Sequence, residues 1–355
     1  MKNHKNLFIT ALFLHFTVAL HASAATQQPS TPIRSPSPTP AIVTSFNGSL
    51  GVRYDNSTTP ENLFQRVQES VVFGFTITPR GVVDLVGMVQ TGSLYGKKWS
   101  TAIDLNDRSK DTLNTTLYFK QIFLQKRFKT FGMPASAQFG ILGTTQRIGT
   151  KTFIGPVTAL GTNSWTEGGR VSLQTHLGDL SVVGGSILDV NNANILTRDR
   201  EMNYLEVQVS KKIFNALAVE ASAGKYDGEA FFRGAAEYEL TLVSEHIIRL
   251  AQEAFYSNQN LNYSTSASTD LGAFFDKNLT GRVNLDLRYS YLAPDSDFSG
   301  LRMNDLTLKG HVISTALYGK IDKAGRVNWF AAKDFLDIKR TQAGLIWNLK
   351  GGNKK

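Results

Sequence analysis

The chain has 355 residues, a formal net charge of +9 and no cysteine. The absence of cysteine excludes disulfide frameworks and thiolate metal sites, and it agrees with an exported chain that needs no disulfides. After the first residues, no stretch is long and apolar enough to span a membrane as a helix, which needs about 20 residues.

The chain begins with a pattern typical of a secretory signal peptide. Lys2 and Lys5 form a short basic start, and the apolar run Leu7–Leu20 follows. Ala22 and Ala24 then supply the small residues of a signal-peptidase site. The alternative, a membrane anchor, needs a run of about 20 apolar residues. We therefore expect residues 1–24 to be a signal peptide and the mature chain to be exported.

Residues 25–43 are rich in proline, serine and threonine, with five prolines in "TQQPSTPIRSPSPTPA" (26–41). Such a segment buries too little apolar surface to fold, so it predicts a flexible periplasmic tether. Contact with a partner such as the cell wall is the alternative.

The stretch "GRVNLDLRYSYLAP" (281–294) shows the pattern that recurs along the rest of the chain. Apolar and polar side chains alternate strictly, which predicts a strand with one apolar and one charged face. In a soluble sheet the apolar face packs on a core, whereas in an outer-membrane barrel it meets lipid and the charges face inward. The apolar face carries Val283, Leu285, Leu287, Tyr289 and Tyr291, and the other carries Arg282, Asn284, Asp286, Arg288 and Ser290.

Similar runs predict about sixteen strands within residues 44–350, followed by a short basic tail, 351–355. The predicted strands are 44–55, 66–77, 82–92, 112–128, 135–144, 167–177, 180–189, 201–211, 217–226, 230–242, 246–256, 264–276, 281–292, 306–320, 326–333 and 338–349.

The lengths of these runs favour a transmembrane barrel over a secreted sandwich or solenoid. Most have ten or more residues, as a tilted membrane strand requires, whereas soluble strands average about 5–6. Short turns such as 177–179 alternate with longer loops, among them 92–111, 145–167 and "SNQNLNYS" (257–264). This alternation is typical of an outer-membrane barrel, and an even strand number places both termini in the periplasm. The predicted fold is an all-β, antiparallel transmembrane β-barrel. Aromatic residues near the ends of apolar faces predict an interfacial girdle: Tyr54, Phe73, Phe75, Tyr289, Tyr291, Trp329 and Trp347.

Charged residues on the opposite face predict a polar interior. A barrel of about sixteen strands is wide enough for an aqueous channel. Each single charge has an alternative role as a salt bridge that braces the wall, and only their collective placement argues for a pore. The candidates are Arg53, Lys120, Arg170, Arg233, Arg288, Arg340, Asp84, Glu206, Glu220 and Glu237.

The mature chain resembles the porins of the Gram-negative outer membrane, in particular through "LYFKQIFLQKRF…ASAQFGILGTTQ" (117–146). In the general porins, the connection that corresponds to residues 145–170 folds into the lumen and forms the constriction. Arg147 and Lys151 lie in this segment, and no acidic residue follows until Glu167. A constriction of this charge would favour anions. The alternative is that both residues contact lipopolysaccharide phosphates at the surface.

We therefore predict a passive diffusion channel for small hydrophilic solutes or ions, surrounded by outer-membrane lipid and lipopolysaccharide. A homotrimer is implied by the resemblance alone. The alternative is a non-conducting structural or adhesive surface barrel. No enzyme, cofactor, metal site or nucleic-acid partner is expected, because His176, His246 and His311 are far apart in sequence and no catalytic or phosphate-binding motif is present.

Overall fold

The structure is a computed structural model that describes residues 42–58, 63–79, 83–91, 102–104, 117–143, 166–187, 202–242, 246–257, 259–293, 310–337 and 339–352. Within these ranges, one antiparallel sheet contains seventeen strands. The strands are β1 (Ile42–Thr58), β2 (Leu63–Pro79), β3 (Asp84–Thr91), β4 (Ala102–Asp104), β5 (Leu117–Thr130), β6 (Met133–Leu142), β7 (Thr166–Thr175), β8 (Gly178–Ile187), β9 (Tyr204–Phe214), β10 (Leu217–Tyr226), β11 (Glu229–Thr241), β12 (Ile247–Ser257), β13 (Asn260–Asp270), β14 (Asn284–Leu292), β15 (Gly310–Lys320), β16 (Val327–Leu336) and β17 (Lys339–Gly352). The helix α2 (Leu271–Phe275) and the 3-10 turn η5 (Lys277–Leu279) lie between β13 and β14.

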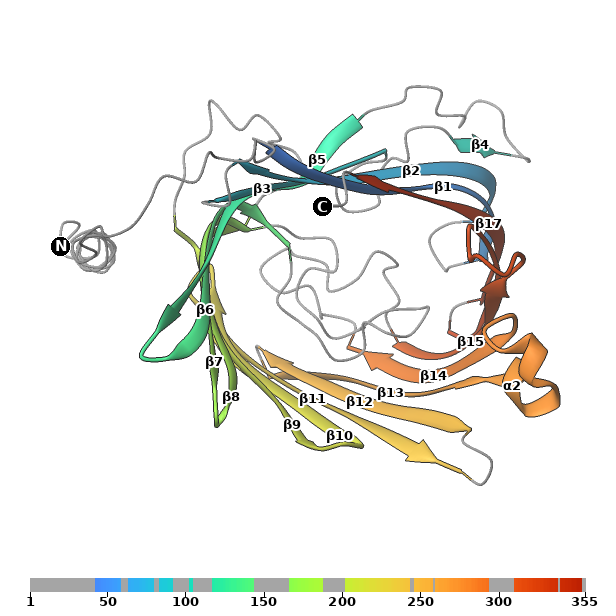
Figure 1. Cartoon of the computed structure of the whole chain (residues 1–355). Helices are drawn as coiled ribbons and strands as arrows, with labels where there is room; N and C mark the ends of the chain where they lie inside the picture. The colour runs from blue at the N-terminus through green and yellow to red at the C-terminus, as the bar shows by residue number, and fades with distance from the viewer. Residues whose placement is uncertain are drawn as a thin grey trace. The chain divides into compact units, whose positions relative to one another are not determined.

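The sheet closes on itself and forms a barrel. Each strand pairs with the next one along the chain, apart from β4, and β17 pairs with β1 from Ser45 opposite Gly352 to Thr58 opposite Lys339. Figure 1 shows this circuit, in which the ribbon runs from blue β1 around the wall to red β17 beside it. β4 instead pairs with residues 66–68 of β2, beyond the part of β2 that pairs with β3. Sixteen of the strands described here therefore make the closed wall.

The two faces of the strands have the opposite polarity to those of a soluble sheet. On β9, Glu206 and Gln208 are 1% and 3% exposed, whereas the alternating Leu205 and Val207 are 46% and 43% exposed. Because side chains alternate across a strand, the charged face points to one side of the wall and the apolar face to the other. This is the arrangement of a membrane barrel, whose outer face meets lipid and whose closure satisfies every strand's hydrogen bonds.

Several hairpins turn within two residues. Asp227 and Gly228 between β10 and β11 have φ of 49° and 87°, and Phe131 and Gly132 between β5 and β6 have φ of 50° and 77°. Two successive positive φ values are typical of the type I′ turn, whose twist matches that of the flanking strands.

All sixteen predicted strands have a counterpart, but three details of the prediction were wrong. The predicted loop 257–264 is a tight hairpin, because β13 already begins at Asn260. The predicted end of that strand, up to 276, is instead α2, whose N-cap Asp270 accepts a hydrogen bond from the Ala273 N–H. β4 was not predicted at all. Among the described residues, no helix has the length and apolar character needed to cross a membrane.

Candidate functional site: the charged inner wall

Three charged residues from neighbouring strands form one end of a network on the charged face. Arg233 of β11 lies opposite Ser222 of β10 and Phe255 of β12. Its guanidinium pairs with Glu220 of β10 on one side and with Glu253 of β12, at 3.5 Å, on the other. The small side chain of Ser222 leaves room for the arginine between the two carboxylates. All three charged side chains are buried, so each depends on its partners rather than on water for its stabilisation.

Arg288 of β14 extends the network across two further strands. It interacts electrostatically with Glu253 of β12 and Asp334 of β16, and also with Asp286 of its own strand. One strand lies between β14 and each of the two strands that carry Glu253 and Asp334, so the backbones of these pairs are about 9–10 Å apart. The side chains of the intervening strands must therefore be small, so that Arg288 can reach both carboxylates. They are: β13 has Ser266 opposite Arg288, and β15 has Ser314 opposite it.

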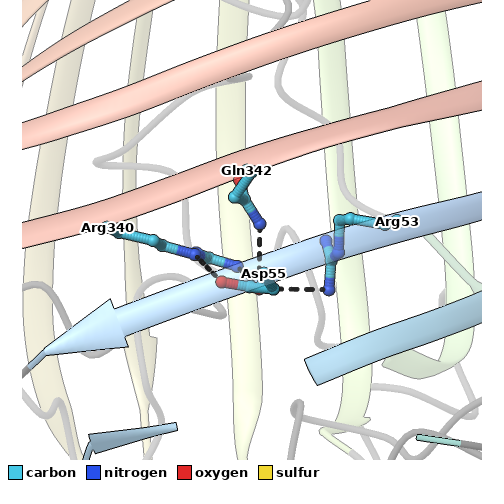
Figure 2. A network of polar contacts seen from close by, with 4 residues as sticks. All are labelled: Arg53, Asp55, Arg340 and Gln342. Atoms are coloured by element: carbon cyan, nitrogen blue, oxygen red, sulfur yellow. Dashed lines mark hydrogen bonds and ion pairs between the residues drawn. The ribbon is translucent and has the colours of Figure 1, made fainter. Parts of the chain in front are cut away.

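The network then crosses the seam at which the barrel closes. Asp334 lies opposite Arg340 of β17 and interacts with it electrostatically. Arg340 forms a bidentate pair with Asp55 of β1, with Nε–Oδ1 at 2.9 Å and Nη2–Oδ2 at 2.5 Å. Gln342 donates a hydrogen bond to the same carboxylate at 3.0 Å, and Arg53 lies 3.7 Å from it. Figure 2 shows these four side chains converging from the two strands.

Together these residues form what we call the ion belt, a row in which the sign of the charge alternates from β10 to β1. Bidentate arginine–carboxylate pairs are among the strongest hydrogen-bonded contacts in proteins. The arrangement links seven strands by electrostatics and does so across the closure seam. Its members are Glu220, Arg233, Glu253, Arg288, Asp334, Arg340, Asp55 and Arg53.

A second polar network lies on the same face of β2 to β7. Asp84 accepts a hydrogen bond from Thr78 at 2.7 Å and pairs with Arg127 at 3.8 Å. The amides of Gln125 and Gln138 are hydrogen-bonded at 2.7 Å. Arg170 donates to the Gln138 side chain at 3.1 Å and to the carbonyl of Gly143.

An apolar cluster interrupts the charged face between β6 and β12. Phe231 is stacked between Tyr204 and Phe255, with ring centroids 6.2 and 5.6 Å away. The Tyr204 hydroxyl donates to Glu206 at 2.5 Å, which satisfies this buried carboxylate. The cluster consists of Leu142, Val183, Ile187, Tyr204, Phe231 and Phe255, none more than 6% exposed. This part of the charged face is therefore covered rather than open to water.

The structure places the sequence-predicted residues as follows. Register and burial put nine of them on the charged face: Arg53, Asp84, Arg170, Glu206, Glu220, Arg233, Glu237, Arg288 and Arg340. Lys120 lies on β5 at an irregularity, where Met88 pairs with Gln121 and Val89 with Phe119, so it has no residue opposite. Arg147 and Lys151 lie outside the described residues, as do the proposed signal peptide and residues 144–165.

Sequence reasoning missed three members of the ion belt, Asp55, Glu253 and Asp334. Asp55 follows Arg53 by two residues, so the period-two alternation already places it on the same face. Glu253 and Asp334 lie on strands whose inner faces mix charged and apolar residues, so the alternation of polar and apolar residues is not clear enough in the sequence to assign them to the inner face. In the described part of the chain, no group of three or more His, Asp or Glu residues has the arrangement to hold a metal ion.

Comparisons with known proteins identify the fold. The sequence matches no protein-family model and no curated protein. The structure is similar to Pseudomonas aeruginosa OccK8 (OprE), with a TM-score of 0.51 and 12% identity over 86% of this chain and 98% of that one. It is also similar to Acinetobacter baumannii OccAB1, with a TM-score of 0.54 and 8% identity over 88% of this chain and 97% of that one. A third similar structure is Pseudomonas aeruginosa OccK3 (OpdO), with a TM-score of 0.51 and 12% identity over 86% of this chain and 96% of that one.

These similar structures are outer-membrane porins. The barrel described above has the fold of these structures, and the predictions of an antiparallel barrel of about sixteen strands and of an outer-membrane location are confirmed.

Proposed function

We propose that this chain, which has the fold of the Gram-negative outer-membrane porins, is a passive diffusion channel for small hydrophilic solutes. The observation that carries the proposal is the closed sixteen-strand wall with its charged face inside. A barrel of this size is wide enough for an aqueous path, whereas an eight-stranded barrel is filled by side chains. Solutes would be sorted by the width and the field of the lumen, with no chemical step.

We further propose that anions are preferred, and that residues 145–167 supply the preference. The described wall does not supply it, because every arginine of the ion belt interacts with a carboxylate. The basic pair Arg147 and Lys151 would then set the field at the narrowest point. The apolar cluster supports an inward fold of this segment, because Leu142 (0% exposed) lies just before it and Thr166, near its end, pairs with Ile187 of the cluster.

The experiment is single-channel recording of the refolded mature protein in a planar bilayer under a KCl gradient. We expect stable conductance steps with a reversal potential set by chloride. The double variant Arg147→Glu/Lys151→Glu should move that potential toward potassium, and a matched pair at the opposite end, Lys277→Glu/Lys323→Glu, should leave it nearly unchanged. A reversal potential set by potassium in the unmodified protein would refute the anion preference, but it would still support the proposal that the protein is a channel.

A non-conducting structural or adhesive barrel is the second candidate function. The burial of the ion belt and the apolar cluster favours it, because residues that line an open pore should be exposed. A correctly folded, heat-modifiable barrel that gives no conductance would establish this alternative.

The remaining parts of the proposal concern assembly. Residues 1–24 would direct export, 25–43 would form a periplasmic tether, and both termini would lie in the periplasm. Homotrimers are proposed by resemblance, and crosslinking of the protein in native outer membranes tests the trimer. Contacts of Arg147 and Lys151 with lipopolysaccharide phosphates are the electrostatic alternative to the basic constriction.

A further inference from the structure

Three buried polar side chains lie in one row of the inner wall, and each has one atom that makes no hydrogen bond. Gln208 of β9 lies opposite Ser222 of β10, and Ser222 lies opposite Arg233 of β11. The three residues are 3%, 7% and 3% exposed. Within the described part of the chain, the Gln208 Nε2, Ser222 Oγ and Arg233 Nε atoms have no hydrogen-bond partner. We call these three residues the Ser222 row.

The members of the Ser222 row are near enough to one another to share a ligand. Directly opposite residues on neighbouring strands have Cβ atoms about 4.5–5.5 Å apart, so Gln208 and Arg233 flank Ser222 on its two sides. A buried polar atom without a partner keeps the full cost of its desolvation, and the great majority of buried polar groups are therefore satisfied. Three such atoms in successive positions indicate one common partner.

The charges around the Ser222 row disfavour an anion as this partner. The Arg233 guanidinium pairs with Glu220 on one side and with Glu253 on the other, so its positive charge is already compensated. The inner-face positions next to the row on β9, β10 and β11 include two carboxylates, Glu206 and Glu220, and no basic side chain. The row thus offers hydrogen-bond donors without a net positive charge.

The donors and acceptors of the row define the ligand more closely. The Gln208 Nε2 and Arg233 Nε atoms can only donate, whereas the Ser222 hydroxyl can both donate and accept. A hydroxyl oxygen fits this set, because its two lone pairs accept from the two flanking donors while its own O–H donates to Ser222 Oγ. These three hydrogen bonds are the number that a buried water typically makes.

We propose that the Ser222 row binds one uncharged hydroxyl oxygen, which belongs either to a water molecule or to a neutral polyol. The bound oxygen satisfies all three buried atoms. It also extends the polar side chains of the ion belt, which includes Arg233, toward β7. Ser181 of β8 lies opposite Gln208, and its hydroxyl contacts that of Ser172 at 3.1 Å. The polar row then runs through five successive strands.

The first test uses the sign of a stability change, measured by urea titration of the full mature chain in detergent. With the oxygen bound, Ser222→Ala loses a hydrogen bond and should lower the urea midpoint. Without it, the same change removes an unsatisfied hydroxyl and should leave the midpoint unchanged or raise it. Gln208→Met, which keeps the length of the side chain, should act in the same direction. An unchanged or raised midpoint in both variants would overturn the site.

The matched control is Ser181→Ala. Ser181 is 6% exposed, lies in the same row and loses a hydroxyl contact that the structure shows, the one with Ser172. We expect Ser222→Ala to lower the urea midpoint by a similar amount. The double variant Ser222→Ala/Gln208→Met should lose less than the sum of the two single losses, because both changes remove contacts to the same oxygen. Strictly additive losses would overturn the shared ligand.

The second test identifies the source of the oxygen. The titration is repeated with glucose as the neutral polyol and with acetate as a small anion. A rise of the midpoint with glucose that disappears in Ser222→Ala assigns the oxygen to a polyol. No such rise, together with the loss expected for Ser222→Ala, assigns it to water, which a crystal structure should show within hydrogen-bond distance of the three atoms. A rise with acetate that disappears in Ser222→Ala would overturn the uncharged ligand.

Folding is checked in every variant by heat-modifiable migration. The site does not depend on conduction, so a folded, non-conducting barrel with these stability changes would refute the proposed channel and leave this inference standing. Stable conductance together with an unchanged or raised midpoint in Ser222→Ala and Gln208→Met would refute the site and leave the channel.

Discussion

Arg340 of the last strand and Asp55 of the first strand form a bidentate ion pair across the seam that closes the barrel. The two residues are 285 positions apart in the chain, and both are at most 5% exposed. Removal of one partner leaves the other charge buried without its main counter-ion, which costs about 3–5 kcal/mol. We therefore expect Asp55→Asn to lower the free energy of unfolding by about this amount, measured by urea titration in detergent with heat-modifiable migration as the readout.

A matched control for the seam is the pair Arg249–Glu239, at 2.8 Å, whose side chains are 40% and 30% exposed. Exposed pairs contribute about 0–1 kcal/mol, so Glu239→Gln should have a small effect. If both variants lose the same free energy of unfolding, the seam pair stabilises the barrel no more than an exposed ion pair does.

The adjacent residues Phe231 and Phe232 provide a test of the two faces of the wall. Phe231 is 1% exposed and its ring occupies the space above Gly224, whereas Phe232 is 57% exposed. Phe231→Ala should destabilise the barrel by about 3–5 kcal/mol, because it leaves a cavity in the stack. Phe232→Ala should cost less than half of that in the same urea titration. A larger loss at Phe232 would contradict the assignment of the faces.

The turn between β10 and β11 predicts a backbone effect. Gly228 has φ 87°, and a Cβ added there would meet no atom within 4 Å. Gly228→Ala therefore tests backbone strain without a clash, and we expect a loss of about 1 kcal/mol. Asp227→Asn, which keeps a residue that tolerates φ 49°, should be close to neutral. Thermal unfolding of both variants measures the difference.

Asp322 in the β15–β16 connection predicts a pH effect. The Val327 N–H and the Arg326 guanidinium hydrogen-bond to its carboxylate and hold the pKa of Asp322 below its ordinary value. The folded state thus favours the charged form. Its stabilising contribution is complete above the unfolded pKa and is lost as the pH falls through the lowered folded pKa. Acid-induced unfolding, followed by tryptophan fluorescence, should therefore depend less on pH in the Asp322→Asn variant than in the unmodified protein. Identical acid profiles would refute the role of Asp322.

The limits of prediction are clearest at β13. The polar composition of residues 257–264 predicts a loop, yet Asn260 already pairs with Ser257 of β12. In a soluble sheet such a composition does indicate a loop. In this barrel the inner face is itself polar, and Asn262 and Ser264 are buried there. Polar composition therefore does not separate strand from loop on the inner face, and only the pairing with β12 decides.

The sequence by itself determined the sixteen strands of the wall, apart from the bounds of β13, together with their two faces and the barrel class. These features follow from a period of two residues, which is local and needs no knowledge of the rest of the chain. Only the tertiary structure decided which charges meet, because the belt links Glu253, Arg288 and Asp334 across strands that present serines between them. The same holds for the seam, where Asp55 meets Arg340 only once the wall has closed. Closure brings residues together through register and strand neighbours, and these depend on the whole circumference of the barrel.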